Sequence, residues 1–182
     1  MLPLKGLIVL VIFSLLSGYF TYTFSIKTDQ LSDEAELTDR ITNNPLDVIV
    51  NDLEGKAVAL KKWQSDLVVL NFWGTWCPPC RREIPLLVQL HKKYLNKGVK
   101  IIGIALDDPT AVKSYLEDNY VPYPVLWGST NVTQLMKELG NEYGSLPFTV
   151  VVDSKGKIMD VHLGEIEEQP FVEILDGLLK IL

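Results

Sequence analysis

A pair of cysteines stands at the junction between a buried strand and a helix, and this junction constrains the fold most. Residues 66–72 contain LVVLNF, a continuous apolar run typical of a strand that is buried on both faces. Cys77 and Cys80 follow at once, and the helical pattern that begins there continues to about Asn96. Because strands that alternate with helices form α/β folds, the sequence predicts an α/β protein with both cysteines at the end of a central strand.

The rest of the domain continues this alternation and supplies the other strands of a mixed sheet. On the helix after the cysteines, the 3–4 spacing predicts one apolar face made of Ile84, Leu87, Val88, His91 and Leu95. The other elements that we expect are an N-terminal hairpin (47–53 and 56–60), strands 99–106, 124–127, 148–152 and 158–163, and helices 109–119, 133–139 and 169–182.

Composition excludes several classes of protein. A chain of 182 residues with 47% hydrophobic and 22% charged residues fits one globular domain and not a disordered chain. The formal net charge of −6 argues against a nucleic-acid binder, which would carry a basic surface. Two cysteines are too few for a disulfide scaffold or an all-cysteine zinc site. We therefore expect no metal and no cofactor.

The N-terminus carries an uncharged apolar run over residues 7–24, which is long enough to span a bilayer. Residues 1–26 are therefore predicted to be a signal anchor, that is, a single transmembrane helix. A cleaved signal peptide stays open, although residues 17–22 lack the small-residue pattern that cleavage requires. A buried core helix fits less well, because the run is apolar throughout.

Charges around this run predict its orientation. Lys5 precedes it, whereas acidic residues dominate the segment after it, so the positive-inside rule places the C-terminal domain outside the cytoplasm. Residues 27–44 are polar and acidic and are predicted to be a linker, with room for a short helix over 32–40. The folded domain is then residues 45–182.

The position of the cysteines favours redox chemistry. A helix N-terminus carries a partial positive charge and free N–H groups, which lower the pKa of a thiol placed there. We expect Cys77, at the exposed mouth of the site, to be the nucleophile and Cys80 to resolve the mixed disulfide. Pro78 and Pro79 are tolerated in the first helical turn, although they remove two N–H donors.

Two structural alternatives compete with this interpretation. A metal-binding cysteine pair would need further ligands, and His91 and His162 are the only histidines. His91 falls on the apolar helix face and is predicted to be a packing residue with its hydrogen bonds satisfied. A plain structural disulfide would not need a strand-to-helix junction, so the C-x-x-C pattern favours a redox site.

Residues 71–85, NFWGTWCPPCRREIP, resemble the thioredoxin superfamily and, within it, the membrane-anchored TlpA/ResA/CcmG-type thiol–disulfide oxidoreductases. The resemblance covers residues 45–182 and includes an extra helix and short strand between residues 106 and 133. It implies a thioredoxin-like fold, a redox-active Cys77–Cys80 disulfide, and Pro85 as the kink of the active-site helix.

Further roles follow from the same resemblance. Pro147 matches a cis-proline that faces the dithiol, and Leu146 before it would offer backbone groups to an extended substrate. Trp76, Pro78 and Pro79 would line the substrate site, while Trp73 has packing as its alternative role.

Glu83 corresponds to a family glutamate that tunes the thiols or gates the substrate, so we expect it to be catalytic. The alternative is a solvated carboxylate paired with Arg82 or a lysine. Plain thioredoxins carry a buried aspartate where this chain has Asn71, which cannot act as a base. Proton transfer would then fall to Glu83 or to water.

Three functions compete. The first is an extracytoplasmic reductase of protein disulfides, with apocytochrome c among its candidate targets. Such a reductase would receive electrons from a membrane donor of the DsbD or CcdA type. It would contact inner-membrane lipid through its N-terminal anchor. The second is a dithiol oxidase, since redox potential sets the direction. The third is a peptide-binding assembly factor that uses the cis-proline groove. Phe148 replaces the acidic residue typical of the CcmG branch, which makes dedicated service in cytochrome c-type biogenesis a weaker expectation.

Overall fold

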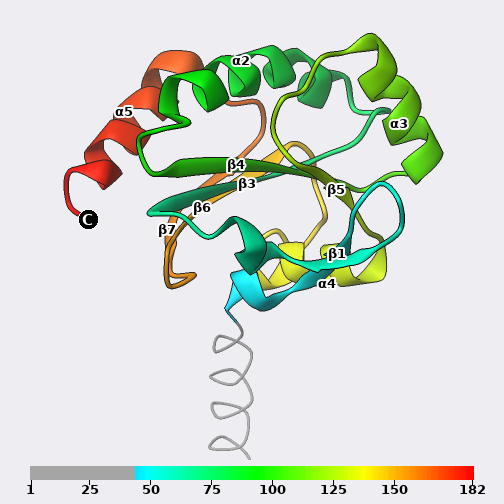
Figure 1. Cartoon of the computed structure of the whole chain (residues 1–182), viewed down its shortest axis with the longest axis horizontal. Helices are drawn as coiled ribbons and strands as arrows, with labels where there is room; N and C mark the ends of the chain where they lie inside the picture. The colour runs from blue at the N-terminus through cyan, green and yellow to red at the C-terminus, as the bar shows by residue number, and fades with distance from the viewer. Residues whose placement is uncertain (1–43) are drawn as a thin grey trace, which may run out of the picture. The chain divides into compact units, whose positions relative to one another are not determined.

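The central strand β3 (Leu67–Trp73) is buried at every residue and organises the domain. It pairs in parallel with β4 (Val99–Ala105) and antiparallel with β6 (Phe148–Asp153). Neighbours on both sides and layers on both faces explain why its sequence is apolar throughout instead of alternating. These contacts come from a computed structural model, which describes residues 44–182 (Figure 1).

The sheet is mixed and has seven strands in the order β2-β1-β5-β4-β3-β6-β7. The strands β3, β4 and β5 (Val125–Trp127) run parallel, and the other pairs are antiparallel. The N-terminal hairpin of β1 (Ile49–Asn51) and β2 (Ala57–Ala59) forms one edge, and β7 (Ile158–Leu163) forms the other. The predicted mixed sheet with its N-terminal hairpin is confirmed.

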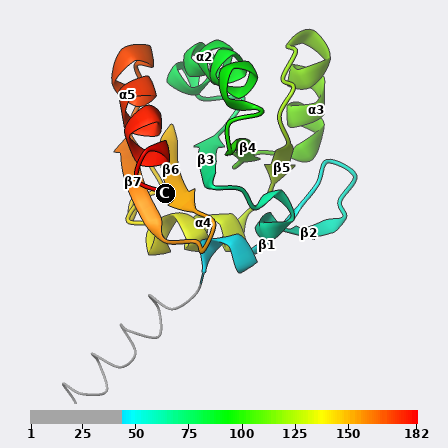
Figure 2. The same cartoon turned by 60° about the vertical axis from the view of Figure 1, so that its left-hand side comes forward.

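Helices cover both faces of this sheet and make a three-layer α/β fold. Figures 1 and 2 show α2 (Pro78–Tyr94), α3 (Pro109–Asp118) and α5 (Glu168–Leu179) on one face and α4 (Thr130–Glu138) on the other. Two short 3₁₀ helices, η1 (Pro45–Asp47) and η2 (Leu60–Trp63), flank the hairpin strands. One apolar cluster fills the α4 side and a second fills the α2–α5 side.

The buried face of α2 differs from the predicted one. Ile84 and Leu87 are buried as expected, but Leu90 and Tyr94 continue the stripe, whereas Leu95 is 43% exposed. The reason is that α2 packs against α5 as well as the sheet. The Tyr94 hydroxyl lies 2.6 Å from the Asp176 carboxylate of α5 and donates to it, and this contact turns the buried stripe toward α5. Helix α4 also begins three residues earlier than predicted.

The predictions for the N-terminal segment fall almost wholly outside the described residues. These are the signal anchor over residues 1–26, the linker over 27–44, of which only Asn44 is described, and the short helix over 32–40. In residues 44–182, no helix combines the length and the apolar character that crossing a bilayer requires.

Candidate active site

Cys77 and Cys80 form a disulfide where β3 gives way to α2. Cys77 is the N-cap residue of α2, Pro78 and Pro79 open the helix, and the two cysteine Cα atoms lie 5.3 Å apart. The backbone N–H of Cys80 donates to the Cys77 sulfur over 3.3 Å. Since both prolines lack an N–H, Cys80 is the first helical residue that can donate to this sulfur.

Both cysteines are buried in the disulfide form. Cys77 is 3% exposed and Cys80 is 0% exposed, so the expectation that Cys77 lies at an exposed mouth is wrong for this form. The physical reason is an apolar cluster in which both cysteines pack together with Trp73, Ile84 and other side chains. Access of a substrate to the Cys77 sulfur therefore depends on the loops around it.

Two neighbouring residues after β4 hold the loop that precedes Cys77. The Asp107 carboxylate accepts from the Thr75 backbone N–H at 2.7 Å and from the Thr75 hydroxyl at 2.6 Å. The Trp76 indole N–H donates to the Leu106 carbonyl at 3.2 Å. Sequence analysis missed Asp107. Its signal is position, because β3 and β4 are parallel and their carboxyl ends meet at the same edge.

Asp107→Ala is expected to lower the free energy of unfolding of the oxidised protein by about 2 kcal/mol, because three hydrogen bonds to a charged acceptor are lost, two from Thr75 and one from the Asp108 N–H. Urea titration with a fluorescence readout measures the change. Asp107→Asn keeps an acceptor oxygen and should recover more than half of the loss. Equal stability of Asp107→Ala and the natural chain would contradict the assignment of Asp107 as the residue that holds this loop.

The loop before β6 carries the cis peptide bond that the family resemblance predicted, between Leu146 and Pro147. Pro147 is buried, and Leu146 packs against the cluster that contains both cysteines. Among the described residues, neither the N–H nor the carbonyl of Leu146 bonds another backbone group. The structure therefore brings backbone groups that have no described backbone partner close to the dithiol.

The two tryptophans of the motif differ in environment. Trp73 is 2% exposed and packs against Tyr115 with ring centroids 5.4 Å apart, so its role is packing. Trp76 is 63% exposed and stands beside Cys77, where it can form the rim of the site. Pro85 lies inside α2, as expected from the motif.

Glu83 is a buried carboxylate. Glu83 is only 2% exposed, so it is not the solvated carboxylate of an ion pair, which was the alternative role. One oxygen accepts from the Asn71 amide at 2.7 Å, and the other accepts from the Ile166 backbone N–H at 3.0 Å. Arg82 turns outward instead and pairs with Glu165, their nearest atoms 2.6 Å apart.

Burial raises the pKa of Glu83 above its usual value, because ionisation in an apolar surrounding is unfavourable. The hydrogen bonds from Ile166 and Asn71 oppose this rise in part, since they stabilise the charged form. Burial also raises the pKa of nearby Tyr123, to which the Glu83 charge adds. A carboxyl with a raised pKa, three residues after Cys80 on the same helix, is suited to exchange protons with a redox-active pair.

Asn71 connects Glu83 to β6. Its Nδ2 also donates to the Thr149 hydroxyl at 3.0 Å, while its Oδ1 is buried without a partner in the described structure. A side-chain amide presents a donor on one side and an acceptor on the other. Rotation of the Asn71 amide would let Oδ1 accept from a protonated Glu83, so this residue can serve both protonation states. Sequence analysis missed Thr149, which follows Phe148 by one residue and carries no motif.

His91 departs from its prediction in one respect. It packs as expected, with its ring 5.9 Å from that of Tyr123, but its Nδ1 is buried without a hydrogen-bond partner. Burial and the Lys100 charge lower its pKa, so the neutral ring is favoured. In residues 44–182 no three side chains of the metal-ligating types come together as a site.

A model of the AhpC/TSA family matches residues 41–161. Thiol-disulfide oxidoreductase ResA of Bacillus thuringiensis (strain Al Hakam) is 37% identical over 134 residues, which are 72% of this chain and 72% of that protein. The protein of the same name in Halalkalibacterium halodurans is 30% identical over 171 residues, 92% of this chain and 90% of that one.

A solved structure extends the comparison to three dimensions. The thiol:disulfide interchange protein of the thioredoxin family from Chlorobium tepidum TLS superposes with a TM-score of 0.64 at 27% identity. The match covers 72% of this chain and 92% of that one. The arrangement of the described domain is therefore similar to that of a protein whose name describes exchange between thiols and disulfides.

Proposed function

The chain belongs to the AhpC/TSA family of thioredoxin-like proteins and is a thiol–disulfide oxidoreductase, and we propose that it reduces protein disulfides outside the cytoplasm. The single observation that carries the direction is the small number of hydrogen-bond donors at the Cys77 sulfur. In the described part of the chain, one backbone N–H bonds this sulfur, because the prolines at the next two positions have none.

The direction follows from how a thiolate is stabilised. A dithiol protein is a strong oxidant when its reduced form is strongly stabilised, which happens when a thiolate receives many donors or positive charges. Here the donors are few, and the buried Glu83 adds negative charge beyond Cys80 when it is ionised. Weak stabilisation of the reduced form favours the disulfide, so the dithiol should give its electrons away.

The reaction proceeds in two exchanges. The Cys77 thiolate attacks one sulfur of the substrate disulfide, which forms a mixed disulfide and releases the other substrate sulfur as a thiolate. Cys80 then loses its proton, and its sulfur attacks the Cys77 sulfur and releases the second substrate sulfur as a thiolate. The substrate gains two electrons, its two thiolates take up the proton lost by Cys80 and one proton from solvent, and the enzyme becomes the Cys77–Cys80 disulfide. Glu83 is proposed to accept the Cys80 proton.

The surrounding residues position the substrate. The free N–H and carbonyl of Leu146, held by the cis-proline Pro147, would pair with an extended stretch around the substrate cysteine. Trp76 would cover that stretch from the other side, since it is exposed beside Cys77. Pro78 and Pro79 would present a flat apolar surface to it.

The proposal extends to the N-terminus. Residues 1–26 would anchor the chain in the inner membrane, and the polar stretch before residue 45 would tether the domain on the extracytoplasmic side. An oxidised enzyme in that compartment needs two electrons for each cycle. A membrane dithiol protein of the DsbD or CcdA type is the class of donor that would supply them. Cysteine pairs such as those of apocytochrome c are candidate substrates.

Equilibration with glutathione buffers tests the direction. We expect the Cys77–Cys80 couple to have a midpoint potential more negative than about −200 mV, because its thiolate receives little stabilisation. Quenching with acid and labelling the free thiols gives the oxidised fraction at each buffer ratio. A midpoint near about −120 mV, the value of a strong disulfide-forming protein, would overturn the reductase direction in favour of an oxidase.

A further inference from the structure

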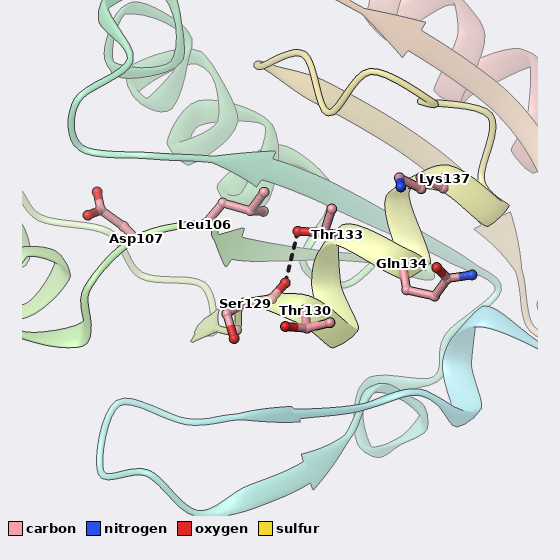
Figure 3. Close-up of a pocket in the computed structure, with 8 residues that line it drawn as sticks. Leu106, Asp107, Ser129, Thr130, Thr133, Gln134 and Lys137 are labelled. Atoms are coloured by element: carbon pink, nitrogen blue, oxygen red, sulfur yellow. Dashed lines mark hydrogen bonds between the residues drawn. The ribbon is translucent and has the colours of Figure 1, made fainter.

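A pocket of about 530 Å³ lies beside α4 and the segment that follows β4. Figure 3 shows its labelled side chains, with Leu106 pointing toward Thr133 across the opening. Gly128 belongs to its floor, and a Cβ at this position would collide with Val132 of α4. The lining consists of Leu106, Asp107, Gly128, Ser129, Thr130, Thr133, Gln134 and Lys137.

One exposed stripe of α4 forms the long wall. Thr130, Thr133, Gln134 and Lys137 follow the i, i+3, i+4, i+7 spacing that places residues on one helical face. Seven residues of helix span about 10 Å. An extended peptide rises about 3.3 Å per residue, so this wall matches about three residues of extended chain.

Several polar groups in this pocket already have hydrogen-bond partners. The Asp107 carboxylate is engaged by Thr75 and by the Asp108 N–H, and the Thr133 hydroxyl donates to the Ser129 carbonyl. The Gln134 amide N–H donates to Glu138 at 2.9 Å. Lys137 makes no ion pair with any described residue. A ligand would therefore meet the Leu106 side chain at one end and one unpaired positive charge at the other.

The pocket is continuous with the redox site through the segment after β4. Leu106 accepts the Trp76 indole N–H through its carbonyl, and Asp107 holds Thr75, while both also line the pocket. Trp76 directly precedes Cys77. The residues that line one end of the pocket thus contact the two residues that directly precede Cys77.

We propose that this pocket binds the substrate polypeptide next to its cysteine, with an apolar side chain over Leu106 and an acidic side chain at Lys137. The inference rests on the proposed function, because the pocket would make the proposed reductase prefer substrates with a particular sequence next to the cysteine. Because the pocket adjoins the loop that carries the dithiol, we expect it to hold a segment of the same substrate and not a separate small ligand. The unpaired charge of Lys137 specifies the acidic residue.

The test uses the reduced full-length protein and a set of disulfide-bonded peptides. Each peptide carries glutamate or lysine at one position, from the third to the sixth residue beyond the attacked cysteine, and bis(2-hydroxyethyl) disulfide serves as the small probe. The variants are Lys137→Glu, which reverses the charge, and Gln134→Trp, which fills the pocket. Lys113→Glu and Glu117→Trp on the exposed side of α3 are the matched controls.

At one of these four peptide positions, we expect the natural chain to have a kcat/KM about 2- to 5-fold higher for the glutamate peptide than for the lysine peptide. A difference of this size is what an exposed ion pair contributes. Lys137→Glu should reverse this preference. Gln134→Trp should lower kcat/KM for both peptides about tenfold, the size of effect of blocking one good contact residue. Rates with the small probe should stay within about twofold for all variants, and both controls should behave as the natural chain.

An unchanged preference in Lys137→Glu would overturn the proposal, and this variant changes only an exposed side chain. Equal reduction of the peptides by Gln134→Trp and Glu117→Trp would overturn it as well. Failure of the proposed function looks different, because the natural chain would then reduce neither the peptides nor the small probe. That outcome would remove both proposals together.

Discussion

Cys77→Ser should abolish disulfide exchange, with the rate of insulin reduction falling by at least about a thousandfold. The reason is that a serine hydroxyl does not ionise near neutral pH, so no nucleophile forms at the N-terminus of α2. We expect that the Cys80 sulfur cannot replace it, since Cys80 is fully buried. Turbidity of precipitating insulin chains, with dithiothreitol as the electron source, measures the rate.

Cys80→Ser is the matched control. It keeps the attacking sulfur and loses only the resolving one, so it should react once and stay attached to its substrate through a mixed disulfide. In cells, non-reducing electrophoresis and mass spectrometry of the trapped adducts would identify the substrates. Full insulin reduction by Cys77→Ser would refute the assignment of Cys77 as the attacking residue, and full function of Cys77→Ser in cells would leave only the peptide-binding interpretation.

Glu83→Gln should slow the resolving exchange by about 100-fold at neutral pH, because a general acid–base group contributes about 10²- to 10⁴-fold. Glutamine keeps the size of the side chain but carries no titrating proton. Rapid-quench measurement of mixed-disulfide decay separates this step from the first attack. The pH profile of the natural chain should contain a transition above the usual glutamate range that Glu83→Gln lacks, whereas a purely structural role would leave the profile unchanged.

The same residue links stability to pH. The folded-state pKa of Glu83 is raised above its usual 4.5, so the folded protein binds this proton more tightly than the unfolded chain does. Stability from this group is therefore fully present below about pH 4.5 and is lost as pH rises through the folded-state pKa. Urea titrations across that range should show Glu83→Gln gaining stability relative to the natural chain as the pH increases.

Sequence patterns predicted those parts of this site that depend on residues close together in the chain. The apolar run of β3 and the prolines that open α2 placed both cysteines at the strand-to-helix junction, because burial and first-turn geometry depend on near neighbours. The cis bond before Pro147 followed from resemblance to a family, since composition alone does not separate cis from trans proline.

The rest of the site depends on tertiary neighbours. Asp107 reaches Thr75 only because two parallel strands end side by side, and Ile166 reaches Glu83 from 83 residues away. The rotated stripe of α2 has the same origin, since Tyr94 turns toward a helix at the far end of the chain. Periodicity detects one apolar face and cannot show that a helix packs against two elements at once.

The turn that joins β7 to α5 contacts two neighbouring residues of α2. The Glu165 side chain holds Arg82 at the surface, and the next backbone N–H, that of Ile166, holds Glu83 in the interior. Protonation of Glu83 weakens the hydrogen bond from the Ile166 N–H and leaves the Arg82–Glu165 ion pair in place. The Ile166 amide resonance should therefore report the protonation of Glu83 on the redox helix, and in an isotope-labelled sample it can be followed without any substitution.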